Sequence, residues 1–306
     1  MGDIFPSTLY HYCSINTFYN IIKNKSIWLS DIKKSNDSME LLALRKLMTE
    51  EINAKFSAFF KNQSSYNNID EFDRIMSLHT ASNNVIMSVP CDTYVFCLSA
   101  EDDLLSQWRG YADDGKGVAI GFKRSFLEKM EDSNELSQRN NKQITFEFSE
   151  VLYDEEDARD YIRNHTAISG FDKCKTRDDI KTCIVNALTD IAIMAPSYKN
   201  FAFHEEREWR LILTLIWDNE DIHDLSFCST DHMKFGKKAY EVVRNRLISH
   251  FALGFSNVTD AISEIVIGPK CIESVEDIRD FLICENVIQP NNKKLIDIRL
   301  SEASYR

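Results

Sequence analysis

The sequence predicts a single α+β domain with a central mixed, mostly antiparallel sheet and helical insertions. Short β-branched and aromatic segments recur along the chain, separated by helices and loops of unequal length. No repeat period is visible, and the 9 Gly and 5 Pro are spread without forming a linker. We therefore expect residues 1–306 to form one domain, with variable helical insertions near 50–90 and 125–200.

The first strand is expected around YHYCS (10–14), where Tyr10 and Tyr12 face one side and His11 faces the other. Later strands are predicted by apolar, β-branched runs that end at polar residues. These runs are 27–30, 93–99, 117–122, 143–153, 208–217, 250–255, 264–269 and 294–300. The run EWRLILTLIW (208–217) is the longest and predicts a buried strand.

Helices are expected where apolar residues recur every three or four positions. Ser14 can cap the first helix with its hydroxyl group, and Asn36 or Asp37 can cap a longer one. The predicted helical segments are 15–25, a long helix after 37, 69–79, 103–112, two helices within 154–198, and 274–286. The polar stretch from 62 to 88 is expected to form an insertion or a mobile cover.

Composition restricts the classes of function. The net charge of −12 argues against coating of nucleic acid by bulk electrostatics, although a local basic groove is compatible with it. No apolar window reaches about 18 residues, and the N-terminus lacks the layout of a signal peptide, so we expect a cytoplasmic protein without membrane contact. The 8 cysteines include no CxxC pair and are expected to be reduced thiols.

The stretch FHEEREWRLIL (203–213) places charges where the chain enters an apolar strand. Side chains two apart in a strand point the same way, so Glu206, Glu208 and Arg210 should share one face. Trp209, Leu211 and Leu213 should pack on the other face. One interpretation is a solvated strand entrance, and the other is a carboxylate held at the edge of a sheet inside a cleft.

Three other clusters hold groups that suit a binding site. His11 is one, although a lone histidine in a strand is more often a core or rim residue. Ser30 and Asn36 flank the start of a helix, where capping explains Asn36 without a ligand. Trp108 and Tyr111 share one helical face, where core packing is the default and stacking on a flat ligand is the alternative.

In combination, these segments resemble a bacterial family catalogued only as a domain of unknown function, family 2971. The similar segments follow the family's order and span most of the chain. They are LYHYCS, IWLS with NDSME, FCLSAEDDLLSQWRGYADDGKGVAIGF, EEREWRLI, AISEIVIGPK and SEASYR. One departure is Glu205, since an aromatic residue is more familiar before the E-x-E.

More distantly, the chain resembles the ADP-ribosyltransferase fold, which has a split sheet. Such enzymes carry a His or Arg on a first strand, a Ser, Thr or Tyr on a second, and a Glu, often as E-x-E, at the start of a later one. Here the corresponding residues are His11, Ser30 or an aromatic, and Glu208 with Glu206 two positions before it. The opening segment, YHYCSINTFYNIIKNKSIWLS, is also similar to that of toxin transferases that modify DNA.

The resemblance implies an enzyme that cleaves the nicotinamide–ribose bond of NAD, either transferring ADP-ribose to a macromolecule or hydrolysing NAD. Toxin or anti-phage defence roles, with an antitoxin or defence partner protein, are implied in the same way. Glu208 would stabilise the positive charge that develops on the ribose, and Glu206 would act as general base or raise the pKa of its neighbour. His11 would donate a hydrogen bond to the adenosine-side ribose. The residues expected around the cofactor are Tyr10, Tyr12, Ser30, Asn36, Trp108, Arg109, Tyr111 and Arg210.

Two alternatives remain open at the level of the sequence. One is a nucleotide-sensing or protein-interaction module without catalysis on a degenerate form of the fold. The other is a metal-dependent nuclease that uses Asp37, Glu40, Glu206 and Glu208 as Mg²⁺ ligands, although no compact D/E-x-K motif supports it.

Overall fold

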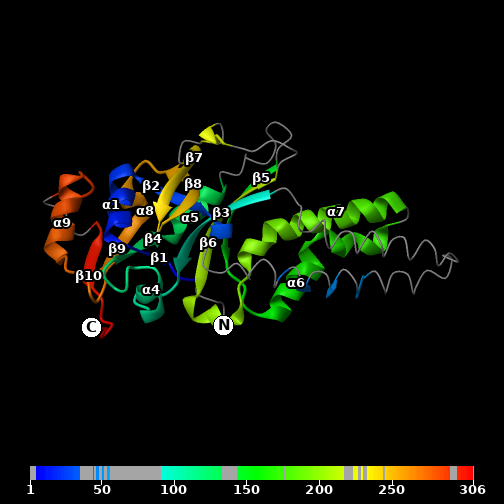
Figure 1. Cartoon of the computed structure of the whole chain (residues 1–306), viewed down its shortest axis with the longest axis horizontal. Coiled ribbons are helices and arrows are strands. Elements are labelled where there is room, and N and C mark those ends of the chain that lie inside the picture. Colours follow the sequence, from blue (N-terminus) through cyan, green and yellow to red (C-terminus); the bar gives the residue numbers. More distant parts are fainter. Residues whose placement is uncertain are drawn as a thin grey trace.

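The protein is described by a computed structural model (Figure 1). It covers residues 5–34, 91–132, 143–174, 177–216, 223–226, 229, 233–243, 245–289 and 295–305, with 44, 46–47, 50–51 and 54–55. The described strands form one sheet, and all its pairs are antiparallel except β9 with β10. The prediction of a mixed, mostly antiparallel sheet with several helices is therefore confirmed.

The sheet is built from segments that lie far apart in the chain. Its strands are β1 (Thr8–Cys13), β2 (Ser26–Asp31), β3 (Cys91–Ser99), β4 (Val118–Lys123), β5 (Gln143–Glu150), β6 (Glu208–Ile216), β7 (Lys234–Val243), β8 (Arg246–Gly254), β9 (Ile262–Ile267) and β10 (Asp297–Leu300). Neighbouring strands pair in the order β10-β9-β4-β1-β3-β2-β8-β7. In addition, β6 pairs with β3, and β5 pairs with β6. Strand β3 therefore has three neighbours.

A strand has only two edges, and this explains the shape of the sheet around β3. Strand β6 pairs with β3 along its whole length, from Cys91 to Ser99. The opposite edge is shared: β1 contacts it at Ser99, and β2 contacts it at Tyr94 and Val95. Strands β1 and β2 therefore diverge, and the sheet splits beside residues 96–98.

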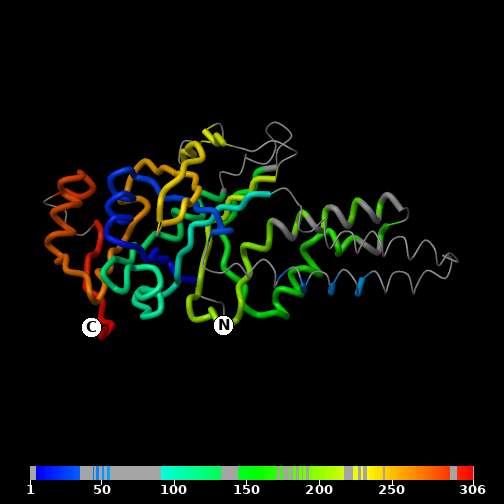
Figure 2. The backbone as a smooth tube through the Cα atoms, viewed as in Figure 1, coloured from blue at the N-terminus to red at the C-terminus, as the bar shows by residue number. Residues whose placement is uncertain are grey.

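Helices cover the sheet on both faces. The described α-helices are α1 (Ile15–Asn24), α4 (Leu105–Gly110), α5 (Arg124–Asp132), α6 (Glu155–His165), α7 (Arg177–Met194), α8 (Val258–Ala261) and α9 (Val275–Cys284). The main core joins α1, α5, α8 and α9 to one face of the sheet. A smaller core on the other face contains Tyr10, Tyr12 and Trp108, the last of these from α4. Figure 2 shows α6 and α7 extending away from the body of the sheet.

Ser14 caps α1 as predicted, because its hydroxyl accepts a hydrogen bond from the backbone of Thr17. No separate prediction was made for three elements: β7, an edge strand with few buried side chains, α5, which buries only Leu127 and Met130 deeply, and the short α8. Strand β7 buries only Phe235 deeply, so no regular alternation of apolar and polar residues identifies it in the sequence. The expected helix at 69–79 and the cap at Asn36 or Asp37 lie outside the described residues.

The start of β4 makes a very close backbone approach at Gly117. A Cβ atom added there would lie 2.0 Å from the carbonyl oxygen of Cys13. We expect Gly117→Ala to lower the free energy of unfolding by about 1–3 kcal/mol or more, because the backbones of β1 and β4 must separate. Gly110→Ala is the matched control: its Cβ would meet nothing within 4 Å, and alanine favours a helix by about 1 kcal/mol. Urea denaturation measures both, and equal stabilities would contradict this interpretation.

Candidate functional site

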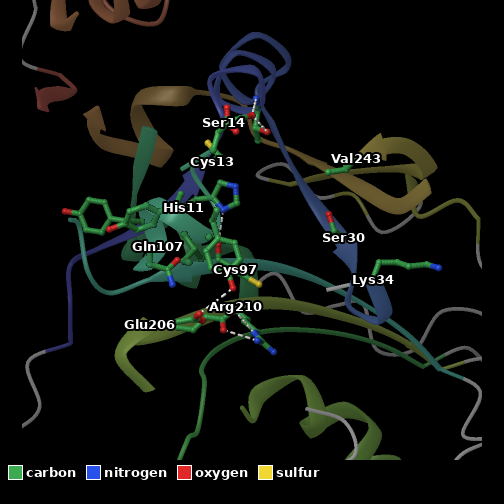
Figure 3. Close-up of a pocket in the computed structure, with 18 of the residues that line it drawn as sticks. His11, Cys13, Ser14, Ser30, Lys34, Cys97, Gln107, Glu206, Arg210 and Val243 are labelled. Atoms are coloured by element: carbon green, nitrogen blue, oxygen red, sulfur yellow. Dashed lines mark hydrogen bonds and ion pairs between the residues drawn. The ribbon is translucent and has the colours of Figure 1, made fainter. Parts of the chain in front are cut away.

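A cavity of about 670 Å³ opens where the sheet splits (Figure 3). Its volume lies within the range of about 300–1,000 Å³ that is usual for ligand sites. Strands β1, β2, β3, β6 and β8 all contribute to the wall, as do α1, α4 and the 3₁₀ helix η6 (Phe201–Glu206). Of the sequence-predicted residues, those that line it are Tyr10, Tyr12, His11, Ser30, Tyr111, Glu206, Glu208 and Arg210.

His11 lies at the point where the strands diverge. Its Nδ1 is 2.9 Å from the carbonyl oxygen of Cys97, which belongs to the part of β3 beside the split. Since a carbonyl oxygen only accepts, Nδ1 carries the hydrogen and Nε2 presents a lone pair. Burial lowers the pKa of His11 to about 4 despite this hydrogen bond, so the ring is neutral at pH 7. We therefore expect Nε2 to accept a hydrogen bond from a ligand, which reverses the donor role expected from the sequence.

The two ends of the candidate site come from opposite faces of the sheet. Tyr10 pairs with Ser99, and Ser99 pairs with Glu208, so these three side chains share one face. His11 lies on the other face, where its ring packs 4.3 Å from that of Phe96. Side chains from both faces line one cavity only because the sheet is open between β1 and β2.

Glu208 is the most constrained carboxylate of the cavity. It is 5% exposed, and the guanidinium of Arg210 binds it through two hydrogen bonds of 2.8 and 2.9 Å. Its backbone N–H donates to the hydroxyl of Tyr153 at 2.8 Å. Trp209, Leu211 and Leu213 pack into the main core on the opposite face, so the predicted alternation along this strand is confirmed.

Glu206 lies close to Glu208 but belongs to a different element. The prediction that Glu206 lies on the same strand as Glu208 is wrong, because Glu206 is the last residue of η6. Arg207, with φ 41°, then turns the chain before β6 begins. Lys199 joins the two carboxylates: its Nζ lies 2.7 Å from Oε2 of Glu206 and 3.1 Å from Oε2 of Glu208. Lys199 is 4% exposed and was not identified from the sequence.

The pKa values of these two carboxylates move in opposite directions. Burial would raise the pKa of Glu208, but Arg210 and Lys199 outweigh it and lower the pKa to about 2. Glu208 is therefore ionised, and Glu206 does not raise its pKa above the ordinary range. Burial raises the pKa of Glu206, and the hydrogen bond from Lys199 offsets this only in part. The pair thus combines a fixed anion with a carboxyl group that is more easily protonated.

The mouth of the cavity is cationic. Lys34 and Arg246 line it from η1 (Ile32–Lys34) and from β8, and both are exposed. Within the part of the chain that the structure describes, neither has an ion-pair partner. With Lys199 and Arg210, four cations face the three carboxylates of Asp113, Glu206 and Glu208. The cavity therefore differs in charge balance from the chain as a whole, which carries −12.

Helix α4 forms one wall, but only part of it faces the cavity. Gln107 and Tyr111 line the cavity, whereas Trp108 is fully buried and donates to Asp103 at 2.6 Å. The expectation that Trp108 stacks on a ligand is therefore corrected: it is a core residue. Arg109 is also outside the cavity lining, and its guanidinium lies over the ring of Tyr305 at 5.8 Å.

The C-terminal segment holds this wall in place. Asp103, just before α4, accepts hydrogen bonds from the hydroxyl of Ser301 and the backbone N–H groups of Glu302 and Ala303. The hydroxyl of Tyr305 donates to Asp114 at 2.6 Å. Residues 301–305 therefore fix the position of α4 from outside.

The structure adds residues that pattern reasoning did not identify. Gln107 and Lys199 lie next to apolar residues in the sequence, so nothing local marks them as part of a site. Lys34 and Arg246 resemble ordinary surface charges in the sequence. Among the described residues, no group of three or more His, Cys, Asp or Glu side chains is arranged to hold a metal ion. Asp37 and Glu40, which the nuclease alternative needs, lie outside them. No helix in the described ranges is long and apolar enough to cross a membrane.

Comparison with known families gives a match to part of the chain. The family described as "Protein of unknown function (DUF2971)" matches residues 107–211. This range runs from the α4 wall to β6 and includes Gln107, Lys199, Glu206 and Glu208. The match supports the family resemblance found in the sequence and carries no activity with it. No curated protein and no solved structure matches the chain.

The buried Glu208 should make stability depend on pH in the acid range. Its pKa is lowered from 4.5 to about 2, so the ionised form stabilises the folded state above about pH 4.5. This contribution, up to about 3 kcal/mol, is lost as the pH falls towards 2. We expect Glu208→Gln to flatten the pH dependence of the free energy of unfolding between those values. The exposed Glu205→Gln is the control, and an unchanged acid profile for Glu208→Gln would contradict the assignment.

Proposed function

We propose that the cavity binds NAD and that the protein cleaves the nicotinamide–ribose bond, transferring ADP-ribose to a macromolecule or to water. One observation carries the proposal: His11 from β1, Ser30 from β2 and Glu208 from β6 line one hollow. The resemblance to ADP-ribosyltransferases names the same three positions. The size of the hollow suits a nucleotide ligand.

The state of Glu208 supports a role in stabilising charge. When the bond between nicotinamide and ribose breaks, its electron pair leaves with nicotinamide and positive charge develops on the ribose. A carboxylate that is ionised and held in one orientation stabilises this charge without reorganising. Arg210 and Lys199 keep Glu208 ionised and fixed in this way.

The remaining groups suit the other requirements of the reaction. The raised pKa of Glu206 suits a general base that takes a proton from the attacking hydroxyl group or water. Nε2 of His11 would accept a hydrogen bond from a ribose hydroxyl. Lys34 and Arg246 at the mouth would neutralise the pyrophosphate.

A second function is favoured by a different feature of Glu208. Both of its carboxylate oxygens are occupied: Oε1 by Arg210, and Oε2 by Arg210 and Lys199. A carboxylate neutralised in this way offers less charge to a developing cation. A nucleotide-sensing module that binds NAD without cleaving it would have the same cavity and the same cationic mouth.

Nicotinamide release from NAD separates the two functions. The purified chain should release nicotinamide, and Glu208→Gln should lower the rate by about 10²–10⁴-fold because a positioned carboxylate is lost. Glu205→Gln, which removes an exposed carboxylate from η6, the 3₁₀ helix just before β6, is the control. Turnover that is unchanged in Glu208→Gln would contradict the role of this carboxylate. Binding of NAD without any release of nicotinamide would favour the sensing module.

A further inference from the structure

Gln107 is a buried polar residue that faces the cavity. It is 7% exposed and lies on the wall of the cavity, where Figure 3 draws its amide group. Within the described part of the chain, no hydrogen bond joins this side-chain amide to another residue. Its amide atoms are not among the described buried side-chain atoms that lack a partner, so they open onto the cavity. The amide is therefore free to exchange hydrogen bonds with a ligand bound in the cavity.

Two neighbours of Gln107 also line the cavity. Gly110 and Tyr111 follow at three and four positions along α4, so they lie on the same side of the helix and also line the cavity. A Cβ atom at Gly110 would meet nothing within 4 Å, so the space above this part of the helix is open. Tyr111 adds an aromatic ring to this part of the cavity wall.

This part of the cavity wall adjoins the carboxylate cluster. The hydroxyl of Tyr111 donates to Oε1 of Glu206 at 3.5 Å, and Lys199 joins Glu206 to Glu208. The exposed cations Lys34 and Arg246 come from η1 and β8 instead. A ligand that spans the cavity would place its phosphates near those cations and one of its rings against α4.

A carboxamide side chain offers a donor and an acceptor next to each other. Its complement is a planar group with an acceptor and a donor at the same spacing, which both the carboxamide of nicotinamide and the edge of adenine provide. We propose that Gln107, with Gly110 and Tyr111, binds such a ring and that the ring is the nicotinamide of NAD. This assignment rests on the proposed function, because the bond to be cleaved joins nicotinamide to the ribose that Glu208 must reach.

Ligand titrations followed by NMR test the proposal. Nicotinamide, nicotinic acid and AMP are titrated separately into the wild type, Gln107→Leu and the control Leu105→Ala, an exposed residue of α4 that does not line the cavity. Nicotinamide should bind the wild type more tightly than nicotinic acid, whose carboxylate lacks the N–H donor. Gln107→Leu should weaken nicotinamide binding about 10–100-fold and leave AMP binding unchanged.

Gly110→Leu gives a second measurement that does not depend on the stability of Gln107→Leu. The new side chain would fill the open space and should abolish nicotinamide binding while the chain stays folded, as thermal unfolding shows. Nicotinamide affinities that are equal in the wild type, Gln107→Leu and Gly110→Leu would overturn the proposal. Loss of AMP binding instead of nicotinamide binding would overturn it too, because the wall would then bind adenine.

These titrations and the nicotinamide-release assay distinguish failure of the Gln107 site from failure of the proposed enzymatic function. Nicotinamide binding that depends on Gln107, without cleavage of NAD, would reject the enzymatic function and keep the binding site. Cleavage of NAD with nicotinamide binding that is independent of Gln107 would reject this site alone.

Discussion

The candidate site depends on one constraint: strand β3 has a single edge for two partners. Strand β6 pairs with the other edge throughout, so β1 and β2 each hold only one end of the remaining edge and must separate. The separation frees the carbonyl of Cys97, which His11 then binds, and it opens a cavity that both faces of the sheet can reach. Without this split, register would keep His11 and Glu208 on opposite sides of a continuous sheet.

The charged side chains at the split determine the electrostatics of the cavity. Two carboxylates and two cations meet at the start of β6, with each charge balanced inside the protein. Burial of an unpaired carboxylate is costly, so Arg210 and Lys199 are needed for Glu208 to remain ionised there. The same contacts hold Glu208 in one orientation, which suits catalysis, and occupy its oxygens, which suits binding alone. The two candidate functions therefore need the same cavity. They differ in whether a bound ligand can interact with Glu208 in place of Arg210 and Lys199.

Local pattern predicted much of the fold and part of the site. The apolar runs predicted β2, β3, β4, β5 and β6, and the alternation in EWRLIL placed Glu208 and Arg210 on one face. Glu206 was misplaced because a positive φ at Arg207 is not visible in an alternating charge pattern. Lys199 was missed because its position depends on a bridge between Leu152 and Tyr198, a contact between distant segments. The convergence of His11 and Glu208 was suggested only by family resemblance, since no local pattern encodes the split at β3.

The proposed function requires that the split in the sheet binds a dinucleotide and that Glu208 lies beside the reacting ribose. A crystal structure of Glu208→Gln grown with NAD tests it most directly, because this variant should bind NAD without consuming it. We expect electron density for NAD between His11 and residue 208, with a ribose next to residue 208 and the pyrophosphate near Lys34 and Arg246. NAD bound elsewhere on the molecule, or an empty cavity at a saturating concentration of NAD, would contradict it.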